Sequence, residues 1–182
     1  MSKKTEGITV YQSDGEGEHR FLGITTIDET ALNIFKIAGD VKNNKYWMAD
    51  CIHSELVEKI SENEFIAYYI TKPPWPVSKR DSIIRVKMVR ESDSRLLVRM
   101  KALPEGEAEK YIKKRSDYVR IYKMTGSVEL NENKGVTEVR FSVSGGPGGR
   151  VPDFIVRWGG WRIPYKTLSG LRAYVLGKKP DK

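Results

Sequence analysis

Residues 73–81 read Pro73-Pro74-Trp75-Pro76-Val77-Ser78-Lys79-Arg80-Asp81, and the run Ile83-Ile84-Arg85-Val86-Lys87-Met88-Val89 follows them. Proline fixes its backbone φ angle and has no N–H group to donate, so three prolines within four residues make a rigid elbow. The run after the elbow is rich in β-branched residues and alternates apolar with basic side chains, which is typical of a strand. The stretch therefore predicts an elbow that leads the chain into a sheet.

The length and composition predict one globular domain, residues 1–182, with its core at about 7–177. The chain has 182 residues, of which 39% are hydrophobic and 10% aromatic, enough for a sizeable core. No run approaches the roughly 18 apolar residues of a membrane span. Met1-Ser2-Lys3-Lys4 leads directly into polar residues, which does not resemble a signal peptide. We expect a soluble protein, cytoplasmic or, after loss of a leader, extracytoplasmic.

Cysteine and histidine are too few for a metal centre. Cys51 is the one cysteine, which excludes an internal disulfide and a cysteine-based zinc cluster, and the histidines are His19 and His53. We therefore predict no metal and no cofactor. The 32 basic and 24 acidic residues give a net charge of +8. This charge is compatible with anionic phospholipid, with nucleic acid, or with neither.

The order of the expected elements indicates an α+β fold with an antiparallel sheet. A first hairpin joins 8–13 to 20–28 through a turn at 14–17. A helix capped by Asp28-Glu29-Thr30 follows and stops at Gly39, and a short helix or turn covers 42–47. The remaining strands are expected at 54–61, 64–72, 81–90, 95–102, 118–130 and 136–144. Residues 103–117 form a charged loop with one helical turn within 107–114.

The C-terminal part predicts a long amphipathic helix. Spacings of three and four place these residues on one helical face: Phe154, Trp158, Trp161, Tyr165, Leu168, Leu171 and Val175. Pro152 suits the first turn, whereas Gly159-Gly160 and Pro164 are expected to kink or interrupt the helix. The glycines at 145–149 form a hinge before it, because they lack the phosphate-loop pattern. A curved antiparallel sheet wrapped around this helix leaves a space between them.

Strand parity predicts which side chains face that space. The inward sets are Ile84, Val86 and Met88; Leu96, Val98 and Met100; Tyr122, Met124 and Val128; and Val139, Phe141 and Val143. The opposite faces carry charged residues such as Arg85, Arg99 and Arg140, as a water-facing side should. The inward residues form either an ordinary core or the lining of a cavity.

Three blocks resemble the START domain, the family related to steroidogenic acute regulatory lipid-transfer proteins, in its short bacterial form. They are Tyr46-Trp47-Met48-Ala49 leading to Leu56-Val57-Glu58-Lys59-Ile60; Tyr68-Tyr69 through Trp75 to Asp81; and Pro147-Gly148-Gly149-Arg150-Val151-Pro152 leading to Pro164 through Arg172. Their order and spacing fit from about Gly7 to Leu176. The chain lacks the N-terminal helix that is common in longer members of the family, and it has apolar Ala67 and Val86 where some sterol-type members place a charged pair.

The resemblance implies a helix-grip fold, in which a curved antiparallel sheet grips a long C-terminal helix around an internal hydrophobic cavity, with that helix as the gate. The expected cavity and gate residues are Tyr69, Ile84, Val86, Met88, Val98, Met100, Tyr122, Met124, Phe141, Phe154, Trp158, Trp161 and Leu168. A structural role is expected for Trp47, Trp75, Pro76, Arg80, Asp81, Gly148, Gly149 and Pro152.

The expected function is non-enzymatic binding, transfer or sensing of a lipid or another hydrophobic small molecule. The alternative is a polyketide cyclase or aromatase on the same scaffold, for which Tyr69, Tyr122, Asp81 and Arg80 are the candidate acids and bases. Nucleic-acid binding is not expected, because no recognition motif accompanies the charge. Residues 151–182 hold seven basic residues against two acids, which fits either contact with an anionic membrane or a solvated outer face. A monomer is assumed.

Overall fold

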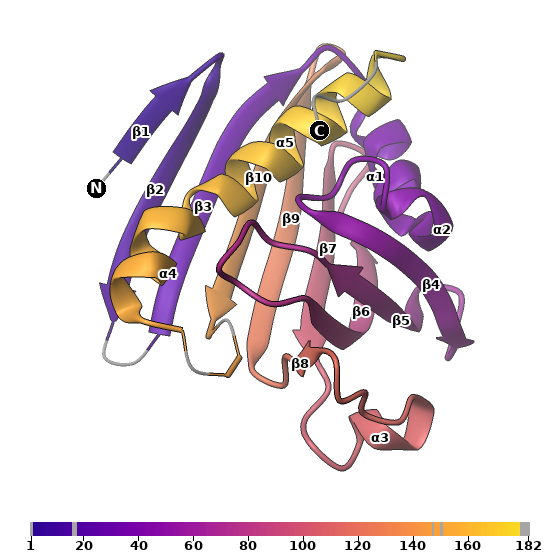
Figure 1. Cartoon of the computed structure of the whole chain (residues 1–182). Helices are drawn as coiled ribbons and strands as arrows, with labels where there is room; N and C mark the ends of the chain where they lie inside the picture. Colours follow the sequence, from indigo (N-terminus) through magenta and orange to yellow (C-terminus); the bar gives the residue numbers. More distant parts are fainter. Residues whose placement is uncertain (1, 16–17, 147, 150, 179–182) are drawn as a thin grey trace.

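One curved sheet forms the body of the molecule (Figure 1). The structure, a computed structural model, describes residues 2–15, 18–146, 148–149 and 151–178. Within these residues the sheet runs in the order β1 (Ser2–Thr5), β2 (Ile8–Gly15), β3 (Glu18–Ile27), β10 (Val136–Gly145), β9 (Met124–Asn133), β7 (Arg95–Ala102), β6 (Arg80–Arg90), β5 (Glu64–Thr71) and β4 (Cys51–Lys59). All these neighbours are antiparallel, and the short β8 (Val119–Arg120) pairs in parallel with β6.

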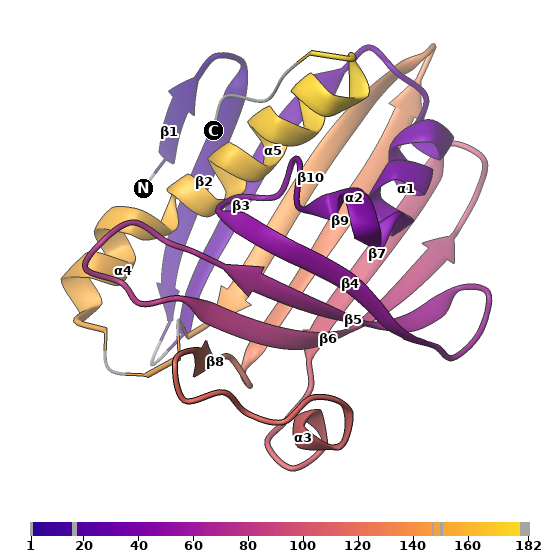
Figure 2. The ribbon, with the colours of Figure 1, turned by 45° about the vertical axis from the view of Figure 1, so that its right-hand side comes forward.

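The longer helices lie against the inner side of the sheet. α4 (Asp153–Gly160) and α5 (Arg162–Val175) follow β10, and α5 packs on β2, β3 and β10. α1 (Ala31–Gly39) packs on β7 and β9, and α2 (Val41–Asn44) on β4. Figure 2 shows the sheet bending around α5, with α1 and α2 beyond its C-terminal half. The short α3 (Ala108–Tyr111) lies at the lower end, away from the other helices. This is the helix-grip arrangement that the resemblance implied.

Two tight hairpin turns use left-handed backbone conformations. Lys134 and Gly135 have φ angles of 52° and 80° between β9 and β10, and Glu6 and Gly7 have 52° and 75° between β1 and β2. Two consecutive positive φ angles match the twist of the flanking strands, as in type I′ hairpins. The predicted strands leave residues 131–135 as the connection here, and the structure narrows it to Lys134 and Gly135. β1 was not predicted, because its four residues are polar or charged and give no alternating pattern.

The start of α1 follows the predicted capping pattern. Thr30 Oγ1 accepts a hydrogen bond from the Asn33 N–H at 3.3 Å. Glu132, at the end of β9, accepts from the Ala31 N–H at 2.8 Å, so a carboxylate also faces the positive end of the helix dipole. The two contacts tie the helix to both the preceding loop and the sheet.

The C-terminal helix is interrupted where the glycines predicted. α4 ends at Gly160 and α5 starts at Arg162. Pro164 falls in the first turn of α5, where the N–H that proline lacks would have no helical partner, so it causes no second break. α5 packs closely on its neighbours: a Cβ atom on Gly23 would lie 2.7 Å from Leu168 Cδ1, and one on Gly170 would overlap the Trp47 carbonyl oxygen.

Two apolar clusters lie on opposite faces of the sheet. The inner cluster, between the sheet and α1, α2 and α5, consists of Ile8, Val10, Ile27, Ala31, Ile34, Ala38, Val41, Trp47, Cys51, Phe65, Ala67, Tyr69, Ile84, Val86, Leu96, Val98, Val128, Leu130, Val139, Phe141, Leu168 and Leu171. The outer cluster, beneath the segment that holds α3, consists of Ile66, Tyr68, Ile83, Leu103 and Ala108. The alternation of residues 65–69 between the two clusters shows that β5 is buried on both faces.

The strand predicted at 118–130 is wrong in one respect. The chain forms β8, leaves the sheet at 121–123, and re-enters it as β9 at Met124. Tyr122 lies in this break and packs on the outer cluster, so the expectation that it faces inward with Met124 is also wrong. The alternation of inward and outward side chains in one strand cannot be extended through an irregular segment, because the alternation starts anew in each strand.

Candidate ligand-binding site

The inner face brings together most of the residues that were expected to line the cavity. Tyr69 from β5, Ile84 and Val86 from β6, Val98 from β7, Phe141 from β10 and Leu168 from α5 are all buried in the inner cluster. β5, β6 and β7 are neighbours in the sheet, β9 lies between β7 and β10, and together these strands form the floor, with α5 as the roof. The surface between them is apolar, as a site for a hydrophobic ligand requires.

Three predicted methionines form the adaptable part of this surface. Met88, Met100 and Met124 are partly buried and pack on the inner cluster. Met100 Cε and Met124 Sδ lie 3.2 and 3.9 Å from the position that a Cβ atom on Gly126 would take, so the two side chains meet over this glycine. Methionine has three flexible torsions and a polarizable sulfur, so such a lining can repack around different apolar shapes.

The helical side of the site is less uniform. Trp161 is partly buried on the inner cluster, with its ring 5.8 Å from Tyr165 and with Lys3 Nζ 3.7 Å above it. Phe154, in the first turn of α4, is instead 70% exposed and points away from the core. The predicted Trp158 lies on α4, but its side chain is outside the described ones. The roof over this part of the sheet therefore belongs mainly to α5.

The elbow positions its tryptophan on the surface. The Trp75–Pro76 peptide bond is cis, and the Trp75 side chain is 93% exposed. The loop between β5 and β6 that holds it lies beside α4 in both views (Figures 1 and 2). Arg80, at the start of β6, is buried and donates a hydrogen bond to the Ser78 carbonyl, which folds the end of the elbow onto itself.

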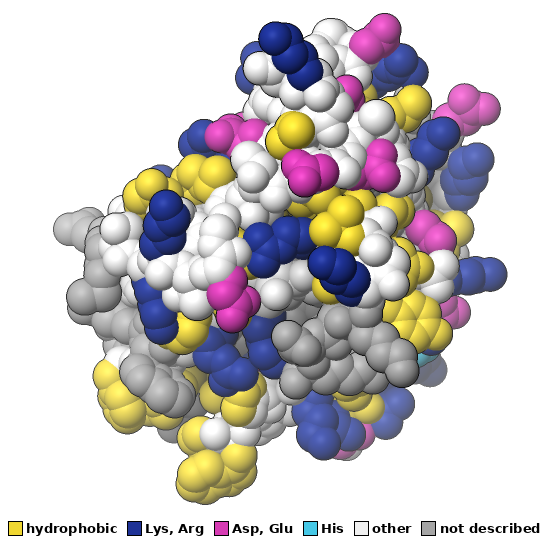
Figure 3. Space-filling model, turned by 90° about the horizontal axis from the view of Figure 1, so that it is seen from above, with side chains coloured by type: hydrophobic (Ala, Val, Ile, Leu, Met, Phe, Trp, Pro, Cys, Tyr) yellow, Lys and Arg dark blue, Asp and Glu magenta, His cyan; other side chains and the backbone are white. Residues whose placement is uncertain are grey.

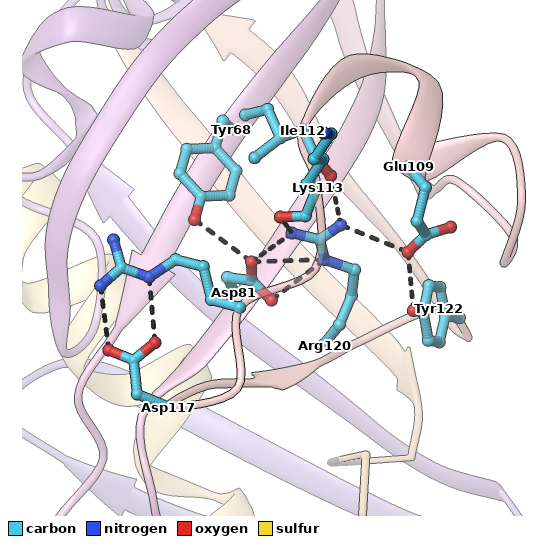
Figure 4. A network of polar contacts seen from close by, with 9 residues as sticks. Tyr68, Asp81, Glu109, Ile112, Lys113, Asp117, Arg120 and Tyr122 are labelled. Carbon is cyan, nitrogen blue, oxygen red and sulfur yellow. Dashed lines mark hydrogen bonds and ion pairs between the residues drawn. The ribbon is translucent and has the colours of Figure 1, made fainter.

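Asp81 belongs to a polar network on the outer side of the sheet (Figure 4). Arg120 Nη2 lies 2.6 Å from Asp81 Oδ2, and both side chains are almost wholly buried. Tyr68 donates to the same carboxylate at 3.2 Å, and Arg120 also donates to the Ile112 carbonyl at 2.6 Å. Burial and the neighbouring Asp81 raise the pKa of Tyr68 to about 12. This network ties residues 109–122 to β5 and β6.

Tyr122 completes that network. Its hydroxyl donates to Glu109 Oε1 at 2.8 Å, and Arg120 Nη1 lies 3.3 Å from the same oxygen. The hydrogen bond from Tyr122, first among several donors, lowers the pKa of Glu109. Of the four acids and bases considered for an enzyme, Asp81 and Tyr122 thus serve the outer network. Tyr69 and Arg80 have the inward parity of β5 and β6.

The predicted glycine and proline positions shape the approach to α4. Gly148 and Gly149 have φ angles of 69° and 63°, and Cβ atoms there would lie 3.3 and 3.2 Å from Val119 Cγ1. Both the backbone conformation and the close approach favour glycine. Pro152 is the N-cap of α4. These residues set the path of the chain between β10 and the helices.

A surface pocket that the sequence did not indicate opens between the α2–β4 connection and α5. It has a volume of about 490 Å³ and is lined by residues 45–52, Lys72, Lys166 and Gly170. Lys166 Nζ lies 2.8 Å from Asp50 Oδ1, and the Ala49 N–H donates to Thr167 Oγ1 at 3.3 Å. Trp47, which was expected to be structural, lines this pocket and is also a buried member of the inner cluster.

Beside Trp47, the inner cluster contains polar groups that sequence reasoning missed. Asn44 Nδ2 donates to the Ala38 carbonyl at 3.3 Å and to the Tyr69 hydroxyl at 3.1 Å. Burial raises the pKa of Tyr69, so its hydroxyl stays protonated. Asn44 Oδ1 and Trp47 Nε1 are buried without a hydrogen-bond partner. Tyr46-Trp47 stood in a block used for the family resemblance, but nothing in the sequence linked Asn44 to Tyr69.

Some basic side chains of the C-terminal segment make contacts within the protein. Arg172 donates to the Glu6 carbonyl at 2.9 Å, and Lys166 pairs with Asp50. Lys179 and Lys182 lie outside the described residues, as does the Arg157 side chain. On the face shown in Figure 3, Lys and Arg side chains are interspersed with acidic and hydrophobic ones. Among the described residues, no group of three or more His, Cys, Asp or Glu could hold a metal ion.

The fold and the inner face define a helix-grip protein, and the family comparison agrees. The START domain family matches residues 2–173, and the chain belongs to this family. The crystal structure of a STAR-related lipid transfer protein from Xanthomonas axonopodis superposes with a TM-score of 0.85 and 29% identity, covering 96% of each chain. Human StAR-related lipid transfer protein 5 has the same fold, with a TM-score of 0.79 at 14% identity over 96% of this chain and 85% of that one.

Curated relatives extend over most of the sequence. An uncharacterized protein of Pseudomonas aeruginosa is 29% identical over 176 residues, which are 95% of this chain and 84% of the relative. The phosphatidylcholine transfer protein of Mus musculus is 27% identical over 162 residues, 85% of this chain and 73% of its own length. In the part of the chain that the structure describes, no helix is both long and apolar enough to cross a membrane.

Proposed function

We propose that this chain binds one lipid or similar hydrophobic molecule between the inner face of the sheet and the C-terminal helices, and that it carries or senses this ligand without chemical change. The observation that carries the proposal is the inner face itself. In a START domain it is lined by apolar side chains, with flexible methionines at its less buried positions. The names of the relatives in Xanthomonas and mouse, both lipid transfer proteins, favour the same class of ligand.

The energetics of burial support a ligand of this kind. Removing apolar surface from water contributes roughly 25 cal/mol per Å², so an acyl chain can supply several kcal/mol of binding free energy after its ordering cost. Burial of a charged headgroup in the same place would cost much more free energy, because its charge would lose its hydration without gaining a partner. The lipid chain is therefore the part that the inner face holds.

Ligand exchange requires part of the roof to move. α4 and α5 are separate helices joined at Trp161; α5 packs on β2, β3 and β10, whereas α4 packs mainly on β3. We propose that the gate consists of α4 with the first turns of α5 and the neighbouring elbow loop. The glycines at 148 and 149 give the chain before α4 its turn and form one end of this segment.

We also propose that the elbow and α4 meet a membrane during exchange. Trp75 is 93% exposed and Phe154 70% exposed, on segments that lie side by side. Exposed aromatic side chains on a rigid turn suit the interface between lipid headgroups and acyl chains. The described basic residues of α5 are partly engaged within the protein, so the aromatic pair is the stronger support for this contact.

The enzymatic alternative has less support. A cyclase needs acids or bases that face the ligand, whereas Asp81 and Tyr122 face the outer cluster, which leaves Tyr69 and Arg80 as the inward candidates. Native mass spectrometry of the purified protein tests the proposal, because a bound lipid adds a defined mass that solvent extraction removes.

A further inference from the structure

The inner cluster contains polar atoms without partners, in an environment that is otherwise apolar. Asn44 and Trp47 are 3% and 6% exposed, and neither Asn44 Oδ1 nor Trp47 Nε1 has a hydrogen-bond partner. Tyr69 is 5% exposed, and its oxygen accepts from Asn44 Nδ2. No acceptor for its hydroxyl proton is found among the described residues. Buried polar groups are nearly always paired in folded proteins, so these two unpaired atoms, beside a tyrosine whose hydroxyl oxygen accepts a single hydrogen bond, point to something that pairs with them.

The orientation of the asparagine amide follows from its neighbours. Nδ2 faces the Ala38 carbonyl oxygen at 3.3 Å, and a carbonyl can only accept, so the nitrogen must be on that side. Oδ1 is then the atom left over. The Trp47 N–H of the main chain donates to the Asn44 carbonyl at 3.2 Å, so the two residues are one turn apart, and side chains at this spacing project from the same face of a turn. Tyr69 reaches the same place from β5.

We propose that Asn44, Trp47 and Tyr69 form a recognition site for an uncharged hydroxyl or primary amide on an otherwise apolar ligand. This inference rests on the proposed lipid-binding function and names the polar group of that ligand. The three residues offer one acceptor, Asn44 Oδ1, and two donors, the Trp47 indole N–H and the Tyr69 hydroxyl. An alcohol group donates one hydrogen bond and accepts two, so it satisfies all three.

The site suits a neutral group and not a charged headgroup. The inner cluster contains no charged side chain; the buried charged residues among those described are Arg80, Asp81 and Arg120. Asp81 and Arg120 pair on the outer face, and Arg80 lies at the elbow. The nearby Cys51 is a neutral thiol, because burial raises its pKa to about 11. Lys45, Asp50, Lys72 and Lys166 line the surface pocket beside Trp47, but none of them belongs to the inner cluster, so a phosphate or ammonium group within that cluster would find no counter-charge there.

Two methionines of the inner cluster lie on the same side of the molecule as the three residues and can repack as a ligand enters. Met88 Cε lies 2.9 Å from the position of a Cβ atom on Gly39, at the end of α1, and Met48 follows Trp47 in the chain. Both methionines are partly buried on the inner cluster. The pocket of about 490 Å³ reaches Trp47 and Met48 from the surface. The recognition site is thus separated from solvent by side chains that repack at low cost.

The test compares two ligands that differ only in the hydroxyl. Competition with a fluorescent fatty-acid probe, using 1-tetradecanol and tetradecane delivered from cyclodextrin, gives an affinity ratio for the wild type and for Tyr69→Phe and Trp47→Phe. We expect the wild type to prefer the alcohol by about tenfold or more, and each variant to lose most of that preference. The ratio is measured within one preparation, so it does not depend on the fraction of a variant that is folded.

A matched control is the neighbouring tyrosine. Tyr68→Phe removes a hydroxyl that donates to Asp81 on the outer face, and it should leave the ratio unchanged. A wild type that binds both ligands equally well would overturn this inference and leave the proposed lipid binding intact, with water as the partner of the three groups. If the wild type binds neither the alcohol nor the alkane and does not retain the fluorescent fatty-acid probe, the proposed function is overturned and the inference falls with it. Equal losses in Tyr68→Phe and Tyr69→Phe would also contradict the inference.

Discussion

At the scale of single residues, two adjacent tyrosines show how the faces of β5 differ. Tyr68 donates to Asp81 in the outer network, whereas Tyr69 meets Asn44 in the inner cluster. The outer hydroxyl belongs to a network whose charges are paired, and the inner one lies among unpaired groups. A satisfied buried network holds a structure in one arrangement, while unpaired groups are typical of a site that awaits a partner.

The buried Arg120–Asp81 pair predicts a large loss of stability when one partner is removed. Arg120→Ala leaves the Asp81 carboxylate buried without its counter-charge and frees the Ile112 carbonyl, so we expect the free energy of unfolding to fall by about 3–5 kcal/mol. Urea denaturation followed by circular dichroism measures this. Arg90→Ala is the control, because its pair with Asp93 is exposed and should contribute about 1 kcal/mol or less. Equal effects of the two substitutions would refute the structural role of the pair.

At the scale of elements, the molecule consists of a rigid sheet and a roof in separate pieces. Antiparallel pairing continues across the whole sheet, from the edge strand β1 to the opposite edge strand β4. The roof consists of α1 and α2 at one end and of α4 and α5 across the rest (Figure 2). The break between α4 and α5 lets the first move without unfolding the second. The elbow loop between β5 and β6 lies beside α4, the helix that is proposed to move.

A disulfide that ties α5 to the α2–β4 connection should slow ligand exchange. The backbone N–H of Ala49 donates to Thr167 Oγ1 at 3.3 Å, so the two residues are neighbours, and the engineered pair is Ala49→Cys with Thr167→Cys in a Cys51→Ser background. Under oxidising conditions we expect release of a fluorescent phospholipid to slow by about tenfold or more, an increase of roughly 1.4 kcal/mol in the barrier, with recovery after reduction.

The control disulfide joins two strands and leaves the helices free. Ser127 and Ser142 face each other on β9 and β10 with their hydroxyls 2.8 Å apart, so a cysteine pair there crosslinks the sheet alone. Its exchange rate should match that of the wild type. If the bridge on α5 leaves release unchanged while the crosslink is complete, motion of α5 is not needed for exchange, and the gate is limited to α4 and the elbow loop.

The exposed aromatic residues predict how the protein meets a membrane. Trp75→Ala and Phe154→Ala should each weaken binding to vesicles of anionic phospholipid, by about tenfold for the more exposed Trp75, because a buried aromatic side chain is worth roughly 1.5–3 kcal/mol. Co-sedimentation with vesicles measures the binding. Leu56→Ala, an apolar residue 42% exposed on the edge strand β4, is the control and should have no effect. A comparable loss for Leu56→Ala would rule out a specific contact through the elbow and α4.

At the scale of the whole molecule, the sequence predicts the architecture better than the site. Alternation along the strands and the spacing from Phe154 to Val175 indicate a sheet and a C-terminal helix, and the glycines at 159–160 indicate its break. Tyr122 is misplaced because an unpaired segment separates β8 from β9. The group around Asn44 could not be predicted, since it depends on a turn and a strand 25 residues apart meeting inside the core.

Lipid binding by the whole molecule is the central claim, and native mass spectrometry with solvent extraction tests it most directly. The account predicts a single added mass per chain, lost on extraction and identified in the extract as a lipid with an uncharged hydroxyl or amide near its acyl chains. Refilling the stripped protein with that lipid should restore the added mass. A chain that purifies empty and takes up no fatty acid, phospholipid, acylglycerol or sterol would contradict the claim.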